Sequence, residues 1–466
     1  MTYDFAIGLD LFIFVACAAL LVRFARLSIA HPATVYLVFH AYVVTARLVS
    51  LRNGAPTLFA NWGPIYDPVR PEELIRAALY ADAVLIVMTS AWIYASSRYG
   101  PLVASARKKV PRKPNLRTDL TWSVVIFALP FALFGFVTSI NVHGAPLVQS
   151  RLGELSNSGY YQILASWPGL LLLVLMYVYG LRWYLMVPMT FYLTAIGLQG
   201  YDRYRLIIPV LAMIQIYLDR RGRSWPHIRG SVLLIVMAIL FFPLKNIGKQ
   251  FQEGRSFDDI VSNAVDASSE AAGGGANDQM FLDEFATTIT LSDWKGKLYW
   301  GQPYWALLVL PIPHAWWRSK PSIGDYIRDL SSADRPMGTS GMIVTIWGET
   351  YANFGFLGML FVPFAFAIWT GRYYFSSRCR NYFSVERLGY LALSVNLIQV
   401  YRDGITSVVF FTFVNMMPVM LVIVLHKVWT PISLIASRSL VDGERPPRPQ
   451  RGRPVLLGRL NSRTKR

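Results

Sequence analysis

Residues 341–374 read GMIVTIWGETYANFGFLGMLFVPFAFAIWTGRYY, and this stretch decides the fold class. Its second half is an apolar run that can cross a bilayer, since a membrane helix needs about 20 apolar residues. A polar set, Glu349, Thr350, Tyr351 and Asn353, lies just before that run. In a helix, Glu349 and Asn353 would lie one turn apart on one face. An acidic residue at the mouth of a membrane helix is costly unless it faces protein or water, which makes Glu349 a candidate functional residue. The alternative is that Glu349 only pairs with a neighbouring arginine and fixes the helix end.

The composition of the chain agrees with this interpretation. Of the 466 residues, 54% are hydrophobic and only 15% are charged, whereas a soluble domain carries about 25% charged residues. The apolar residues form long blocks, which predicts an all-α polytopic membrane protein with a single transmembrane domain over residues 1–436. Residues 437–466 are rich in arginine and proline, and we expect a disordered basic tail against the anionic inner leaflet.

The apolar blocks predict about eleven membrane crossings. Alternate loops between them are strongly basic, and basic loops are expected on the cytoplasmic side. The N-terminus is therefore expected outside the membrane and the C-terminus in the cytoplasm. The basic cytoplasmic loops account for most of the net charge of +18, so we expect no nucleic-acid partner. The expected crossings are 5–25, 33–51, 74–97, 120–140, 161–181, 183–199, 205–218, 230–247, 355–373, 387–401 and 405–427.

A long segment, residues 248–350, is expected on the outer side. Its first part, 251–293, is acidic and contains the sequence AAGGGAND, which predicts a flexible link. Residues 298–317, LYWGQPYWALLVLPIPHAWW, are aromatic and interrupted by proline, which predicts interfacial or re-entrant helices. A connection of this length is usually functional, so we expect a lid or a binding element.

Basic residues at the outer ends of the expected crossings are candidates for anion binding. They are Arg203 and Arg205 in GYDRYR, Arg402 in YRDG, and Arg318 with Lys320. Arginine forms bidentate contacts with phosphate oxygens, so a group of such residues at one membrane depth would bind the pyrophosphate of a lipid. The alternative is that Arg203 and Arg402 pair with the adjacent Asp202 and Asp403 as membrane anchors.

Other polar residues give weaker signals. Arg151 lies in the loop VQSRLGE, where a solvated charge is the alternative to substrate contact, and His314 lies beside a tryptophan pair. Asp82 lies within the third apolar block, and we expect it to pair with Arg47 or Arg76 across helices, with a transport role as the alternative. No cluster of cysteine and histidine stands out, so neither a metal nor a cofactor is expected.

Three pieces of the sequence resemble a known family. They are residues 311–321 within LPIPHAWWRSKP, residues 348–358, GETYANFGFLG, and the turn with Arg203 and Arg205. In a multi-spanning chain with a long outer segment, this combination resembles the O-antigen polymerases, often called Wzy. The pattern Glu-x-Tyr-x-Asn-Phe-Gly-x-x-Gly is the most specific of the three. Some members carry paired arginine motifs in two outer loops, and no convincing pair of that kind is found here.

The resemblance implies a GT-C-like membrane glycosyltransferase in the bacterial inner membrane. It would join undecaprenyl-pyrophosphate-linked oligosaccharide units on the outer face, with membrane lipid and a chain-length regulator as further partners. Glu349 would act as the base, and Arg203 and Arg402 would stabilise the leaving pyrophosphate. The residues expected to bind substrate are Arg205, Lys320, Arg318, Tyr351, Asn353, His314 and Arg151.

Three alternatives remain open from the sequence. An O-antigen ligase-like transferase would use the same donor with a different acceptor. A lipid-linked oligosaccharide flippase would carry polar residues along the bilayer midplane and internal symmetry, whereas the polar residues here concentrate at the outer ends. A structural assembly protein would not need converging arginines.

Overall fold

The structure is a computed structural model that describes residues 2–57, 69–107, 116–143, 155–198, 203–227, 280–309, 312, 316–317, 319–321, 344–379 and 384–429. Within these ranges the chain is helical, with no β-strand. The expected crossing at 230–247 and the tail at 437–466 lie outside the described residues. The helices are α1 (Tyr3–Phe24), α2 (Pro32–His40), α3 (Ala46–Arg52), α4 (Pro71–Arg107), α5 (Thr118–His143), α6 (Leu155–Tyr179), α7 (Trp183–Leu198), α8 (Arg203–Arg220), α11 (Phe281–Lys295), α12 (Gln302–Val309), α14 (Ile346–Arg378) and α15 (Val385–Asp403). The π-helical segments are Ala41–Thr45 and Val409–Val414, and a last apolar helix covers Met417–Trp429.

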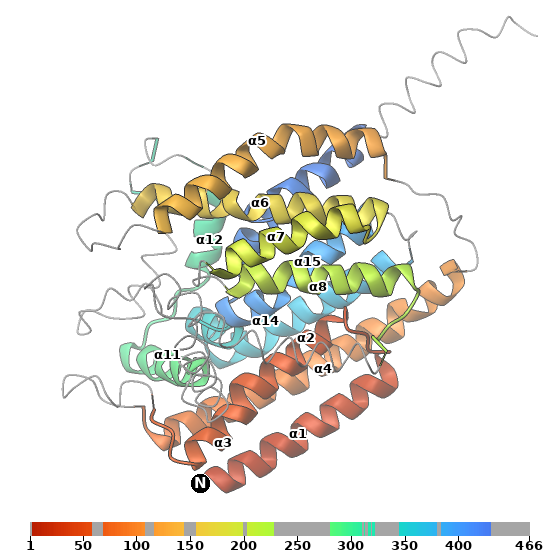
Figure 1. Cartoon of the computed structure of the whole chain (residues 1–466). Coiled ribbons are helices and arrows are strands. Elements are labelled where there is room, and N and C mark those ends of the chain that lie inside the picture. The colour runs from red at the N-terminus through yellow and green to blue at the C-terminus, as the bar shows by residue number, and fades with distance from the viewer. Residues whose placement is uncertain are drawn as a thin grey trace, which may run out of the picture.

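The helices pack around two apolar cores that meet at α15 (Figure 1). The first core joins α1, α2, α3, α4, α11 and α14, and the second joins α5, α6, α7, α8 and the last helix. α15 contributes Leu397 and Tyr401 to the first core, and Leu388 and Val395 to the second. α11 and α12 lie at the end of the bundle that carries the N-terminus (Figure 1). α15 therefore connects the two cores, and its C-terminal end packs in the first core.

Five helical stretches in the described residues are long and apolar enough to cross a membrane: Tyr3–Phe24, Pro32–Arg52, Pro71–Pro101, Thr118–Thr138 and Ile346–Arg378. Their outward faces carry large apolar side chains, such as Phe12 of α1 and Ile126 of α5, which are 72% and 67% exposed. Such faces suit lipid, as expected for a helical membrane protein. Helices also lie over the expected crossings at 161–181, 183–199, 205–218 and 387–401.

The acidic part of the outer segment, 251–293, ends in a core helix, and its expected flexible link, AAGGGAND, lies outside the described residues. Residues 281–293 belong to α11, which buries Phe285 and Ile289 against α4 and α14. A buried ion pair fixes this helix: Arg47 donates from Nε and Nη2 to the two carboxylate oxygens of Asp283, at 2.9 and 2.7 Å. At least one carboxylate of this acidic part is therefore neutralised inside the core.

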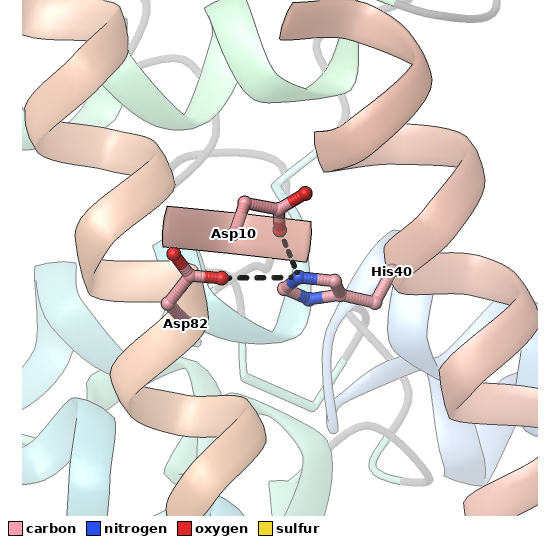
Figure 2. A group of neighbouring side chains, drawn as sticks. All are labelled: Asp10, His40 and Asp82. Carbon is pink, nitrogen blue, oxygen red and sulfur yellow. Dashed lines mark hydrogen bonds and ion pairs between the residues drawn. The ribbon is translucent and has the colours of Figure 1, made fainter. Parts of the chain in front are cut away.

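The sequence predicted that Asp82 pairs with Arg47 or Arg76, and this prediction is wrong. It joins Asp10 and His40 in a fully buried group that links α4, α1 and α2 (Figure 2). The His40 Nε2 lies 2.9 Å from Asp10 Oδ1 and 3.3 Å from Asp82 Oδ1. Arg47 forms an ion pair with Asp283, and Arg76 forms one with Asp293. Helix packing, and not charge alone, therefore selects the partners.

We predict that Arg47→Ala lowers the free energy of unfolding by about 3–5 kcal/mol, because it leaves the Asp283 carboxylate buried without its guanidinium. The control is Arg52→Ala, whose ion pair with Asp4 is 59% and 67% exposed and contributes at most about 1 kcal/mol. Unfolding of the purified variants in detergent measures both values. Equal losses in the two variants would contradict the assigned role of the buried pair.

Candidate functional site

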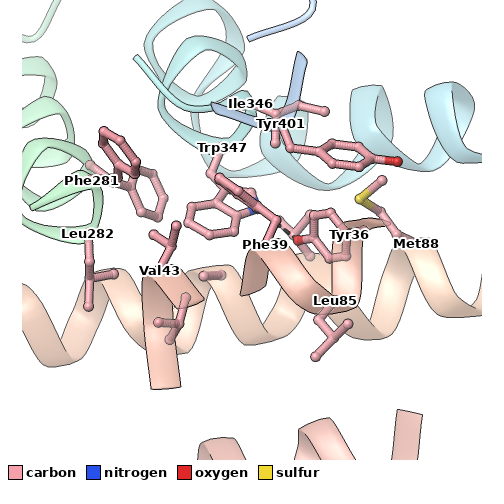
Figure 3. Packing of buried hydrophobic residues seen from close by; sticks show 14 of the residues in the cluster. Tyr36, Phe39, Val43, Leu85, Met88, Phe281, Leu282, Ile346, Trp347 and Tyr401 are labelled. Carbon is pink, nitrogen blue, oxygen red and sulfur yellow. Dashed lines mark hydrogen bonds between the residues drawn. The ribbon is translucent and has the colours of Figure 1, made fainter. Parts of the chain in front are cut away.

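The start of α14 is fixed by an aromatic group around Trp347 (Figure 3). Trp347 is fully buried, and its indole Nε1 donates to the Tyr36 hydroxyl at 2.8 Å. Its ring packs on Phe39 and Phe285, with centroids 5.4 and 5.6 Å away. Thr345 caps the helix by accepting from the Gly348 N–H at 3.2 Å. The first turns of α14 therefore hold one orientation against α2 and α11.

The polar set lies inside α14, whereas the sequence placed it just before a crossing that begins at residue 355. The helix begins at Ile346 and breaks at Gly355, where φ is 67° and ψ is −162°. Glycine adopts this left-handed φ without the steric cost that a Cβ brings. A proline-free break of this kind is not visible in hydrophobic periodicity, but it lies at residue 355, where the sequence placed the start of the crossing.

Asn353 attaches the segment before α12 to the break in α14. Its Oδ1 accepts from the Gly301 N–H at 3.0 Å, and its Nδ2 donates to the Glu349 carbonyl at 2.8 Å. The carbonyls of Ala352 and Asn353 accept from the N–H groups of Tyr299 and Trp300, at 3.1 and 2.9 Å. The break thus supplies backbone acceptors that position residues 299–301.

Glu349 lies one turn before Asn353 and is only 1% exposed. Its carboxylate contacts the turn that follows α15: both oxygens lie 3.3 Å from the Thr406 N–H, and Oε2 also lies 3.3 Å from the Thr406 hydroxyl. The Tyr304 hydroxyl and the Ile405 N–H also interact with this carboxylate. Gly404 lies directly against it, so that a Cβ there would overlap a carboxylate oxygen.

These contacts define what the carboxylate can do chemically. Among the described side chains, no basic group lies within ion-pair distance of Glu349, and its partners are neutral donors at the start of the next helix. Such donors orient a carboxylate and favour its negative charge. Glu349 therefore accepts hydrogen bonds that join α14 to the end of α15 and the turn after it (residues 402–406, called the Arg402 turn here).

Arg402 sits on that turn but pairs with its neighbour. Its Nε lies 3.1 Å from Asp403 Oδ1, and its guanidinium carbon lies 5.6 Å from the centre of the Phe281 ring. This is the anchor alternative considered from the sequence. Burial raises the pKa of Asp403 to about 6, against the opposing effect of Arg402. The Arg402 side chain remains 38% exposed, so it is available to an anion.

Lys320 and Tyr351 are used in packing contacts. The Lys320 Nζ donates to the Ile312 carbonyl at 2.6 Å and the residue is 9% exposed. The Tyr351 hydroxyl donates to Asp293 Oδ1 at 2.7 Å, and Arg76 binds the other oxygen of that carboxylate at 3.0 Å. In these contacts neither side chain is directed at Glu349.

The side chains of the remaining predicted site residues are not among those that the structure describes. Arg203 and Arg205 belong to the first turn of α8, and their side chains are outside the description. Arg151, His314 and Arg318 lie outside the described residues. The site that the structure assembles therefore contains Glu349, Asn353 and the turn with Arg402.

Sequence reasoning missed the partners of Glu349 and the Asp10, His40 and Asp82 group. The sequence YRDGITS contains a signal for the first, since a glycine with a threonine two residues later suits a tight turn that caps a helix. The second has no such signal, because its members are far apart in sequence and meet only through the packing of three helices.

The fold and the site define a helical membrane protein with an enclosed carboxylate at the start of α14. Comparison with known proteins adds no relative: no protein-family model, no curated protein and no solved structure matches the chain. The function of the site is therefore argued from its own residues.

We predict that Gly404→Ala destabilises the protein more than Gly54→Ala does. Both glycines have positive φ, at 89° and 85°, so alanine costs about 1–2 kcal/mol of backbone strain at either position. Only at Gly404 does the added Cβ meet a carboxylate, whereas nothing lies within 4 Å of it at Gly54. Thermal unfolding of both variants measures the difference, and equal shifts in Tm would contradict the contact.

Proposed function

We propose that this protein is a membrane glycosyltransferase that polymerises undecaprenyl-pyrophosphate-linked oligosaccharide repeat units into a surface polysaccharide. The proposal includes a GT-C-like bundle of about eleven crossings in the bacterial inner membrane, with the N-terminus in the periplasm and the C-terminus in the cytoplasm. The observation that carries it is the contact between the enclosed Glu349 carboxylate and the Arg402 turn. Glu349, an acceptor of protons, thereby contacts the residues that directly follow Arg402 in the chain.

In the proposed reaction, Glu349 takes the proton of an acceptor hydroxyl while that oxygen attacks the anomeric carbon of the donor sugar. The bond from that carbon to the pyrophosphate oxygen breaks, and undecaprenyl pyrophosphate leaves with the electron pair. Arg402 and Arg203 stabilise the developing charge on the leaving group. The lipid pyrophosphate itself activates the sugar, so the reaction needs no nucleotide sugar.

The enclosure of Glu349 gives the proposal a conformational step. At 1% exposure the carboxylate is out of reach of a sugar hydroxyl until residues 404–406 move away. Its bonds to Thr406 are 3.3 Å long, near the weak end of the hydrogen-bond range, and Gly404 has the backbone freedom of a hinge. A base that is exposed only when acceptor is bound would protect the activated donor from water.

One observation favours a second candidate, a flippase for lipid-linked oligosaccharide. Asp10, His40 and Asp82 form a buried ionisable group inside the bundle, and such groups often mark ion pathways in transporters. An ion pathway would not require the contact between Glu349 and the Arg402 turn.

Purified protein incubated with lipid-linked repeat units tests the proposal against its rivals. A ladder of lipid-linked products supports a polymerase. Transfer of the sugar only to a lipid A core acceptor would indicate a ligase instead. Movement of the substrate across vesicles without new glycosidic bonds would indicate a flippase.

We predict that Glu349→Gln abolishes polymer formation while the protein still reaches the membrane. Glutamine keeps an oxygen that can accept from the Thr406 N–H, so a purely structural role would leave most of the activity. The control is Glu72→Gln, because the Glu72 side chain is 77% exposed. Product length on gels is the measurement, and ladders of normal length from Glu349→Gln would remove Glu349 from the role of base.

We also predict that Arg203→Lys reduces polymer formation, because lysine cannot make the bidentate contact that a pyrophosphate offers to arginine. Arg52→Lys is the matched control, since Arg52 pairs with Asp4 at an exposed position. The rate of repeat-unit addition with purified protein is compared for the two variants. Full activity of Arg203→Lys would favour the anchor role of Arg203.

A further inference from the structure

We propose that Asp10, His40 and Asp82 bind one divalent transition-metal ion, with Zn²⁺ as the best-suited member of the class. The three residues come from α1, α2 and α4, and one ligand atom from each lies within 4.8 Å of the other two. Figure 2 shows both carboxylates directed at the same edge of the imidazole ring. The proposal is independent of the proposed function, because it uses neither Glu349 nor Arg402.

The hydrogen bonding of this group is incomplete as the residues stand. His40 Nε2 carries at most one hydrogen, which serves Asp10 Oδ1 at 2.9 Å. Asp82 Oδ1 is aimed at the same nitrogen from 3.3 Å but has no hydrogen-bond partner, and Asp82 is only 2% exposed. Asp10 Oδ2 is likewise buried without one. A buried carboxylate oxygen in this state is costly, and a cation between the three ligand atoms would satisfy both carboxylates at once.

The spacing of the donor atoms fits a small metal ion. Zinc bonds to histidine nitrogen and carboxylate oxygen are about 2.0–2.2 Å long, which puts tetrahedral ligands about 3.3 Å apart. The Nε2 atom lies 2.9 and 3.3 Å from the two carboxylate oxygens. Two carboxylates and a neutral imidazole together carry two negative charges, which one dication neutralises. When the metal binds Nε2 of an imidazolium, the Nε2 proton is released to solvent and the hydrogen on Nδ1 stays, so the ligand is a neutral imidazole.

Aromatic rings of α1 and α14 lie against His40, one of the three ligands. The Phe14 ring stacks on His40 with centroids 6.2 Å apart, and Trp347 lies 6.1 Å away on another side. Thr45 interacts with Asp10 and lies in the π-helical segment that begins directly after His40. Such segments occur frequently at functional sites. A bound ion would tie α1, α2 and α4 together beneath the first turn of α14.

The test uses full-length, tag-free protein in detergent, because a polyhistidine tag would itself bind zinc. The protein is stripped with a chelator and dialysed against ZnCl₂, and bound metal is counted by mass spectrometry. We expect one Zn²⁺ per chain and a rise in Tm on zinc addition. Asp82→Asn should weaken binding about tenfold or more and remove the Tm shift. Asp119→Asn, a 60% exposed carboxylate of α5, should change neither.

A second measurement keeps the proposal testable if Asp82→Asn does not fold. Wild-type protein is titrated with CoCl₂, and a visible absorption band that zinc displaces stoichiometrically supports a site of nitrogen and oxygen ligands. No stoichiometric zinc in the wild type would overturn the proposal and would leave a shared proton as the occupant. Zinc binding that Asp82→Asn does not weaken would also overturn it, because the ion would then lie elsewhere.

Discussion

A carboxylate enclosed in a helix bundle needs donors within the protein, and the contact of Glu349 with Thr406 meets that need. The contact depends on the close approach of two backbones, since Gly404 leaves no room for a side chain beside Glu349. It joins the first turn of α14 to the end of α15, two elements that are separated along the chain by the whole length of α14. The segment GETYANFGFLG, residues 348–358, is thereby joined to the Arg402 turn.

The two cores explain why this contact is held in place. α15 packs into both of them, and its C-terminal end lies in the first core together with α14. α14 is held from the other side by Trp347 and by the segment 299–301, which binds the break at Gly355. The ion pair of Arg47 with Asp283 adds α11 to the same group of helices. A polar site is therefore built on packed helices, and the short turn at residues 404–406 covers its carboxylate.

Much of the fold could be predicted from the sequence, because long apolar blocks report helices directly. The pairing of Glu349 with Asn353 on one face also followed from helical spacing, and the structure places them one turn apart. The core position of α11, the break at Gly355 and the partner of Asp82 could not be predicted. Each depends on which helices pack together, and hydrophobic periodicity along a single segment holds no such information. The incorrect pairing of Asp82 with Arg47 shows this most clearly, since charge matching alone left several partners equally plausible.

The central claim is that the enclosed carboxylate and the arginine of the adjacent turn act on one lipid pyrophosphate substrate. A structure of the protein with a bound lipid-linked repeat unit, determined by electron cryo-microscopy, tests this most directly. The account predicts the pyrophosphate in contact with the Arg402 guanidinium, and a sugar hydroxyl beside a Glu349 carboxylate from which residues 404–406 have moved away. A substrate bound far from Arg402, with Glu349 still enclosed by Gly404 and Thr406, would contradict it.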